Sequence, residues 1–419
     1  MFLGSVIDVA TSKPALEVAD IFRLHFEEYL QTHHCRAEEF AAVNALIKCR
    51  TAALGGHLRQ CDQCKKLQIA YNSCNNRNCP KCGGFEKAQW LAAQGARLLP
   101  VPHFHGVFTV DHLVNPVAYV NPEEIYDLLF RTVNRVLKAF AAKYLGGEIG
   151  VTAVLHTWGQ TMQHHIHVHT MITAGALVET VDGYAWKASA PKFLFPVVEL
   201  SASFRDAFCK GLRRLHRQQK LRLVGECAEV DVEQMVGAMQ AKQWEVYLGA
   251  PPEKAKLADL LGYLGRYVHR TAITNQRLRK FEQGKVSFEY YDNRERDAEG
   301  KGEKKLMTLS ATEFIHRFLR HVLPFQYKRV RHFGLYASGN KLWRQAVRLL
   351  LGKTFEPPQA PRLQLSDWLQ SLGIQAAMRC PFCEQGTMRL GRDFAPLPGY
   401  VLWLLFLLGV PVFGKEATS

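Results

Sequence analysis

Apolar and polar residues follow two different periodicities along this chain. Apolar positions recur at helical spacing in residues 14–50, 123–143 and 255–273, so this pattern predicts helices. Residues 101–110, 150–158 and 164–173 instead show the pattern of strands, with many β-branched residues. The alternation of the two patterns predicts an α+β fold in which helices cover an antiparallel sheet.

Three histidines spaced two apart lie within the strand predicted at residues 164–173. Because side chains alternate along a strand, His165, His167 and His169 share one face, whereas residues two apart on a helix do not face each other. Imidazoles on one face have the geometry of a metal site. A histidine-rich strand without a ligand shows the same pattern, and this motif alone does not separate the two.

Five closely spaced cysteines lie between residues 57 and 83, as Cys61-x2-Cys64, Cys74 and Cys79-x2-Cys82. Two CxxC pairs separated by 14 residues come close to the spacing of zinc ribbons. We therefore expect a structural zinc ion with Cys61, Cys64, Cys79 and Cys82 as its ligands. Cys74 and His57 remain as substitute ligands or as part of a second site.

The other cysteines are less informative. The first 14 residues lack the basic and apolar regions of a secretory signal, which predicts an intracellular, reducing environment and argues against disulfides. Cys380-x2-Cys383 has no partner pair nearby, so either its remaining ligands come from elsewhere in the fold or the site is degenerate. The isolated cysteines are expected to be buried small side chains or inert thiols; they are Cys35, Cys49, Cys209 and Cys227.

The helix predicted at residues 255–273 carries two tyrosines. Tyr263 and Tyr267 are four residues apart and therefore share one helix face, with Arg266 and Arg270 beside them. On its own, such a pair is more typical of amphipathic residues packed at the edge of a core.

Charge favours a polyanionic partner. The chain has 53 Lys and Arg against 38 Asp and Glu, a formal charge of +15, which suits nucleic acid, although an anionic membrane surface or simple solubility would also be compatible. Basic residues concentrate in two segments, 211–223 and 327–334, and such a run is either a solvated face or a surface for single-stranded DNA. In the first segment, the candidate DNA-binding residues are Arg213, Arg214 and Arg217.

Together, the strand motif His167-Val168-His169, the helix motif Tyr263-Leu-Gly-Arg-Tyr267 and the cysteine-rich region resemble the two-tyrosine HUH transposases of rolling-circle insertion sequences. The likeness runs from about His57 to Ala337. It implies the ferredoxin-like palm of HUH nucleases preceded by a helical and zinc-binding module. The expected domains are residues 1–97 for that module, 98–345 for catalysis and 346–419 for a carboxy-terminal region.

The residue types suit phosphodiester chemistry. Attack by Tyr263 or Tyr267 would leave a 5′-phosphotyrosine and a free 3′-hydroxyl. A magnesium or manganese ion held by His167, His169 and a third ligand would polarise the scissile phosphate. Gln160 is the third ligand that we expect; the alternatives are His165 and His156.

The expected substrate is single-stranded DNA at the element ends and at the target, in the bacterial cytoplasm at the nucleoid. No helicase motor is evident, so strand separation would come from a host helicase or from replication. Two alternatives remain: a replication initiator or relaxase, and a zinc-dependent DNA-binding protein whose nuclease site is inactive. The apolar residues 400–413 are fewer than the roughly 20 that span a bilayer, so we expect a buried helix, or a tail altered by truncation or a change of reading frame, and no membrane partner.

Overall fold

The chain forms two compact units, which the computed structural model describes at residues 16–251, 265, 271–296, 302–353, 364, 379–398 and 401. The first unit contains Met1–Gln89, Thr271–Val322 and Arg362–Ser419. The second contains Trp90–Arg270 and Leu323–Pro361. Residues 271–322 therefore make their contacts with the amino-terminal part of the chain, although they lie within the range 98–345. The division at residues 97 and 345 stays a prediction about functional domains.

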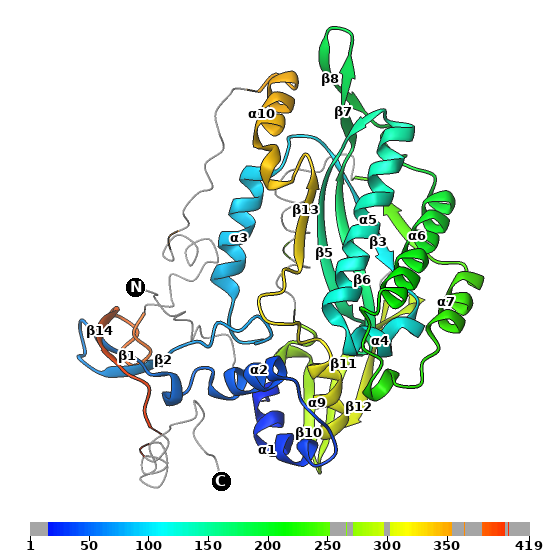
Figure 1. The fold of residues 1–419 in the computed structure, drawn as a ribbon. Helices are drawn as coiled ribbons and strands as arrows, with labels where there is room; N and C mark the ends of the chain where they lie inside the picture. The colour runs from blue at the N-terminus through cyan, green and yellow to red at the C-terminus, as the bar shows by residue number, and fades with distance from the viewer. Residues whose placement is uncertain are drawn as a thin grey trace. The chain divides into compact units, whose positions relative to one another are not determined.

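The second unit is built on a five-stranded antiparallel sheet in the order β13-β5-β6-β3-β9 (Figure 1). Its strands are β3 (His103–Thr109), β5 (Gly150–Trp158), β6 (His164–Thr173), β9 (Val246–Gly249) and β13 (Val330–Gly334). The central position of β6 agrees with its β-branched, largely apolar sequence, because both neighbours bury its edges.

Two long helices cover one face of this sheet, α5 (Pro122–Tyr144) and α6 (Val197–Arg217) (Figure 1). Helix α5 begins with proline at its first position and two glutamates in its first turn, which suit the helix dipole. The core between sheet and helices includes Phe108 of β3 in edge-to-face contact with Phe204 of α6, with ring centroids 5.2 Å apart. This packing fixes which strand residues point inward and which point to the other face.

Shorter elements complete the second unit. They are β4 (Gly147–Glu148), β7 (Gly175–Thr180), β8 (Gly183–Ala188), α4 (Asn115–Val120), α7 (Val232–Ala241) and α10 (Lys341–Leu350). A small core at one end of the sheet surrounds Tyr336, whose hydroxyl accepts a hydrogen bond from the Leu99 backbone N–H (3.1 Å). The unit boundary itself falls within α3 (Gly84–Arg97).

The first unit combines helices with two small antiparallel sheets. Helices α1 (Val18–Leu30) and α2 (Ala37–Lys48) come first in the chain, and α9 (Ala311–Leu319) packs on α1 through Phe22 and Phe318, 5.3 Å apart. One sheet is a meander of β10 (Leu278–Glu282), β11 (Lys285–Arg296) and β12 (Gly302–Ser310).

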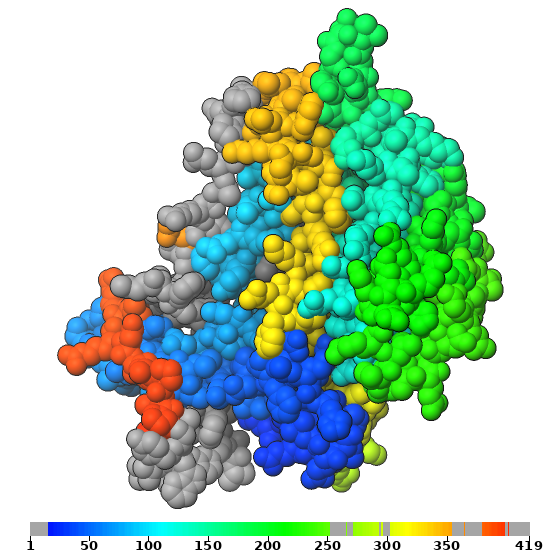
Figure 2. Space-filling view, viewed as in Figure 1, coloured from blue at the N-terminus to red at the C-terminus, as the bar shows by residue number. Residues whose placement is uncertain are grey.

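The other sheet of this unit joins distant parts of the sequence. It has the order β14-β1-β2, with β1 (Gly56–Cys61), β2 (Leu67–Tyr71) and β14 (Met388–Phe394). In Figure 2 the residues of β14, in orange-red, lie against the blue residues of β1 and β2.

The predicted fold class is confirmed. The helical pattern of residues 14–50 and 123–143 corresponds to α1, α2 and α5, and the three predicted strands are β3, β5 and β6. None of the helices in the described part of the chain combines the length and apolar composition that a bilayer span requires. The apolar stretch 400–413 lies outside the described residues except for Val401.

Candidate functional site

Three imidazoles converge on the sheet face that α5 and α6 leave free. Strand β6 directs His167 and His169 to this face because Ile166 and Val168 are buried in the core on the other side. His156 of β5 lies directly opposite His167 in the antiparallel register. One ring nitrogen from each of these three histidines lies within 4.8 Å of the other two. We call this group the histidine cluster.

The histidine cluster has the spacing of metal ligands. The Nε2 atoms of His167 and His169 are 3.1 Å apart, close to the separation of about 3 Å that two ligands at neighbouring corners have when each bond is about 2.1 Å long. His167 Nδ1 lies 2.9 Å from the carbonyl oxygen of His165, so its N–H donates there and the Nε2 lone pair remains for a cation. Burial, followed by the neighbouring His165, lowers the pKa of His167 to about 3, which keeps the ring neutral.

A fourth histidine, His105 of β3, contacts His169 of the histidine cluster. Its Nε2 lies 3.1 Å from Nδ1 of His169, and the two rings are stacked at 5.4 Å. Burial lowers the pKa of His105 to about 4, so its neutral ring can accept the His169 Nδ1–H bond. No motif in the sequence singles out His105, although its period-two position in residues 103–109 and a pairing of β3 with β6 point to it.

The other residues expected at this site lie in different parts of the chain, and some lie outside the described residues. Gln160 lies in the turn between β5 and β6, and its role as third ligand stays a prediction; His156, an alternative in the sequence, is part of the histidine cluster. His165 is exposed on β6. The two tyrosines and the arginines beside them lie outside the described residues; these are Tyr263, Tyr267, Arg266 and Arg270.

The basic residues of α6 lie away from this face. Arg213 binds Glu233 and Gln240 of α7, both at 2.7 Å, so it joins two helices. Arg214 and Arg217 are exposed. Because α6 covers the opposite side of the sheet, any DNA contact made by these residues lies away from the histidine cluster.

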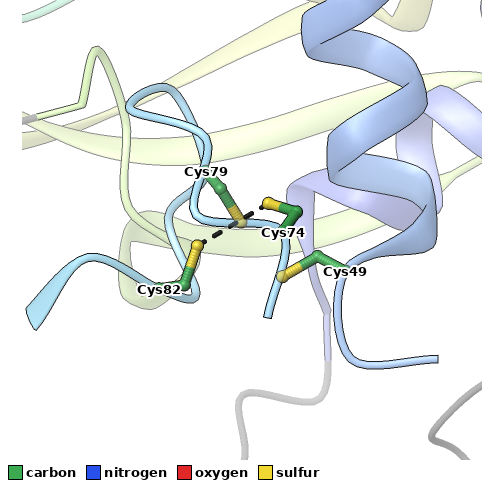
Figure 3. A group of neighbouring side chains, drawn as sticks. All are labelled: Cys49, Cys74, Cys79 and Cys82. Atoms are coloured by element: carbon green, nitrogen blue, oxygen red, sulfur yellow. Dashed lines mark hydrogen bonds between the residues drawn. The ribbon is translucent and has the colours of Figure 1, made fainter. Parts of the chain in front are cut away.

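The cysteines form two groups of four, and this division differs from the one expected. The first cysteine cluster is Cys49, Cys74, Cys79 and Cys82 (Figure 3), and the second is Cys61, Cys64, Cys380 and Cys383. The four ligands expected from the CxxC spacing therefore do not share one site. The pairing of β1 with β14 brings the carboxy-terminal CxxC to Cys61 and Cys64, which leaves the other CxxC with Cys74 and Cys49.

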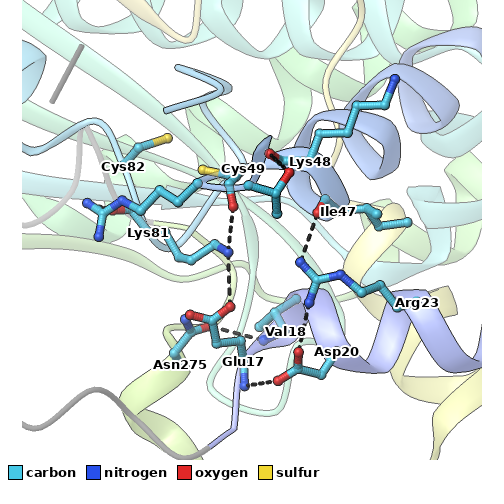
Figure 4. A network of polar contacts seen from close by, with 12 residues as sticks. Glu17, Val18, Asp20, Arg23, Ile47, Lys48, Cys49, Lys81, Cys82 and Asn275 are labelled. Atoms are coloured by element: carbon cyan, nitrogen blue, oxygen red, sulfur yellow. Dashed lines mark hydrogen bonds and ion pairs between the residues drawn. The ribbon is translucent and has the colours of Figure 1, made fainter. Parts of the chain in front are cut away.

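The first cysteine cluster is held at the end of α2. Lys81 donates hydrogen bonds to the Cys49 carbonyl oxygen and to Glu17, both at 2.9 Å, and Arg50 donates to the Lys81 carbonyl at 2.8 Å (Figure 4). These bonds fix the loop that carries Cys74 to Cys82 against Cys49. His57 takes no part; its Nδ1 lies 2.6 Å from Asp393.

The spacing of the sulfur atoms fits zinc. In the first cluster the Sγ atoms of Cys74 and Cys82 are 3.6 Å apart, and all four lie within 4.8 Å; a tetrahedral site with Zn–S bonds of about 2.3 Å has S···S edges of about 3.8 Å. Four cysteines leave no open coordination position, so such a site is structural. The expectation that Cys49 is an isolated thiol is wrong, because Cys49 belongs to the first cluster. No local spacing in the sequence marks it.

Two family models match this chain. A family model described as a transposase zinc-binding domain matches residues 21–110, and one described as a putative transposase matches residues 150–342. A putative transposase, y4qJ, of Sinorhizobium fredii (strain NBRC 101917 / NGR234) is 39% identical over 385 residues, which cover 89% of this chain and 94% of the relative. The transposase for insertion sequence element IS801 of Pseudomonas savastanoi pv. phaseolicola is 27% identical over 362 residues, 82% of each chain.

Among solved structures, the conjugative relaxase TrwC in complex with oriT DNA, in a metal-free structure, is 14% identical. The match covers 60% of this chain and 73% of that chain, with a TM-score of 0.22. The family itself is shown by the sequence relatives, which this chain matches over most of their length. The chain belongs to the two-tyrosine transposases of insertion sequences that carry an amino-terminal zinc-binding domain.

Proposed function

We propose that this transposase cuts and rejoins single-stranded DNA at the ends of its element through a 5′-phosphotyrosine intermediate. The observation that carries the proposal is the histidine cluster, in which His156, His167 and His169 present ring nitrogens to one another on the sheet face opposite α5 and α6. Three imidazoles whose ring nitrogens converge within 4.8 Å suit a divalent cation. Mn²⁺ and Mg²⁺ are the ions that we propose, and, when bound, such an ion polarises a scissile phosphate.

Tyr263 and Tyr267 are the proposed nucleophiles. The phenolate oxygen of one tyrosine forms a bond to phosphorus while the bond from phosphorus to the 3′ oxygen breaks, so the energy of the phosphodiester is kept in the protein–DNA link. The released 3′-hydroxyl can later attack the phosphotyrosine and restore a phosphodiester. Strand transfer by this route consumes no nucleotide cofactor. Two tyrosines allow one to hold a first strand while the other acts on a second.

DNA binding is assigned to basic side chains. Arg266 and Arg270 flank the tyrosines in the sequence and are proposed to contact the phosphates beside the cut. Arg214 and Arg217 are exposed on α6 and are proposed to bind DNA away from the histidine cluster. Strand separation by a host helicase is part of the same proposal.

The polarity of the cut tests this function. Single-stranded DNA from an element end, labelled at its 3′ end, should become covalently attached to the protein, because the tyrosine links to the 5′ phosphate of the downstream fragment. The same DNA labelled at its 5′ end should yield a shorter free fragment that a DNA polymerase extends from its 3′-hydroxyl. Label from the 5′ end on the protein, or a fragment ending in a 3′ phosphate, would contradict the proposal.

The third metal ligand can be identified by comparing two variants. We propose His156 as the third ligand in place of Gln160, because one of its ring nitrogens lies within 4.8 Å of those of His167 and His169. His156→Ala should then lower the affinity for Mn²⁺ strongly, and Gln160→Ala should change it little. The measurement is the rise in unfolding temperature on adding Mn²⁺, which reports binding to the folded protein without DNA. A loss of the Mn²⁺ effect in Gln160→Ala with retention in His156→Ala would assign the ligand to Gln160.

A further inference from the structure

The second cysteine cluster joins two parts of the chain that are more than 300 residues apart. Cys61 ends β1 and Cys64 follows it, whereas Cys380 and Cys383 precede β14. The Sγ atoms of Cys61 and Cys383 are 3.7 Å apart, and those of Cys64 and Cys380 are 3.6 Å apart. These separations match the edges of about 3.8 Å in a tetrahedral zinc site with four sulfur ligands.

The two CxxC segments have the same local conformation. The residue after the second cysteine is left-handed in each, Lys65 with φ 60° and Glu384 with φ 56°. A non-glycine residue costs roughly 1–2 kcal/mol in this conformation, so it persists where its surroundings require it. Each turn also closes on its first cysteine, whose backbone N–H donates to the carbonyl of Lys66 (3.0 Å) or Gly386 (2.7 Å).

Backbone N–H groups point at the sulfur atoms on both sides of the cluster. On one side Gln63 and Cys64 donate to Cys61 Sγ, each at 3.4 Å. On the other side Phe382 donates to Cys380 Sγ and Gly386 donates to Cys383 Sγ, also at 3.4 Å. Such donors stabilise thiolates, the form in which cysteine binds a metal.

Hydrogen bonds between Asp62 and Thr387 also hold the two CxxC segments together. The backbone N–H of Asp62 donates to the Thr387 carbonyl (3.0 Å), and the Thr387 N–H donates to the Asp62 carboxylate (2.7 Å). A Cβ atom on Gly386 would lie 2.3 Å from Cys61 Sγ, so only glycine allows this approach. The cluster is thus a built site whose four sulfur atoms lie within 4.8 Å of one another.

We propose that the second cysteine cluster binds a zinc ion of its own, so that the carboxy-terminal segment completes the amino-terminal zinc-binding domain. The match to that domain ends at residue 110 and so includes only two of the four ligands. Four cysteines close the coordination sphere, which makes this ion structural. It fastens residues 380–394 to β1, and it does so independently of the nuclease proposal.

Two disulfides, Cys61–Cys383 and Cys64–Cys380, are the competing explanation. A disulfide places two sulfurs about 2.05 Å apart and gives no reason for the two pairs to gather at one point. Here all four sulfurs lie within 4.8 Å of one another, and those of Cys61, Cys380 and Cys383 accept backbone N–H hydrogen bonds. This arrangement favours a shared metal ion over two separate bonds.

Metal content of the purified full-length chain tests the proposal. Elemental analysis by mass spectrometry should find two zinc ions per chain, and Cys380→Ser/Cys383→Ser should retain one. Cys35→Ser is the matched control, because Cys35 belongs to neither cluster, and it should keep two. One zinc ion in the unaltered chain, two in the double variant, or iron in place of zinc would overturn the proposal.

A second measurement uses the unaltered chain, in case the double variant does not fold. Alkylation with N-ethylmaleimide, read by peptide mass spectrometry, should leave Cys64 and Cys383 unmodified until a chelator removes zinc. Cys35 belongs to neither cluster, so the extent of its modification should be the same with and without chelator. Reaction of Cys64 and Cys383 without chelator would contradict the zinc site, and release of these thiols only by a reductant would identify disulfides.

Discussion

Replacement of His167 by alanine should abolish metal-dependent DNA cleavage while DNA binding persists. His167 is 7% exposed and belongs to the histidine cluster, with its Nε2 3.1 Å from that of His169. Loss of an outer-shell partner of a metal ligand lowers affinity or activity by about 10–100-fold, so removal of a ligand itself should cost more than about 100-fold. The measurement is the rate of cleavage of end-labelled single-stranded DNA over a range of Mn²⁺ concentrations.

An exposed histidine provides the control for this variant. His112 of the second unit lies outside the histidine cluster, and its side chain is 76% exposed; His112→Ala should cleave at the unaltered rate. Circular dichroism of His167→Ala should show retained secondary structure, which separates loss of the ion from loss of the fold. Cleavage by His167→Ala within a few-fold of the unaltered rate would remove the histidine cluster from the mechanism.

The double variant Tyr263→Phe/Tyr267→Phe should lose the covalent protein–DNA adduct. Phenylalanine keeps the ring of each tyrosine and removes only the oxygen that would bond to phosphorus, so the chemistry has no nucleophile. Loss of a nucleophile from a catalytic group that acts as a unit reduces turnover by about 10⁴-fold or more. The expected result is therefore adduct below detection, with DNA affinity little changed.

The two single variants test the role of each tyrosine, and a tyrosine elsewhere in the chain serves as the control. If the tyrosines have different roles, Tyr263→Phe or Tyr267→Phe alone will block the first cut, while the other single variant will cut but fail to rejoin strands. Tyr184→Phe is the matched control, because Tyr184 is 45% exposed on the β7–β8 hairpin. An adduct that survives in the double variant would require another nucleophile.

The local elements were readable from the sequence because each depends on neighbouring residues. Alternation along residues 164–173 predicts the strand and puts His167 and His169 on one face, and the buried positions of Ile166 and Val168 agree with that pattern. The helical spacing of residues 123–143 likewise reflects one apolar face, which α5 packs on the sheet. Such periodicity is a property of the segment itself.

Partners brought together by strand pairing were harder to predict. His156 meets His167 because β5 and β6 are antiparallel with these two residues in register, and one shift of register would separate them. His105 depends in the same way on the pairing of β3 with β6. The sequence offered His156 only as one of several third ligands, since register is set by packing on the far side of the sheet.

The spacing of the cysteines predicted the wrong grouping of metal ligands. Two CxxC pairs separated by 14 residues resemble one zinc ribbon, yet each pair belongs to a different cluster. The second cluster requires β14 to pair with β1 from more than 300 residues away, and Cys49 joins the first cluster because Lys81 and Arg50 tie the loop to α2. Contacts over such separations leave no periodic trace in the sequence.

The most direct test of the account is to identify the amino acid that becomes linked to DNA. The purified transposase is incubated with single-stranded DNA from an element end, with Mn²⁺ or Mg²⁺ and without either, and the nucleotide-bearing peptide is sequenced by mass spectrometry. The account predicts an adduct that needs the ion and maps to Tyr263 or Tyr267. Tight DNA binding with no adduct in either ion, or an adduct on another residue, would contradict it.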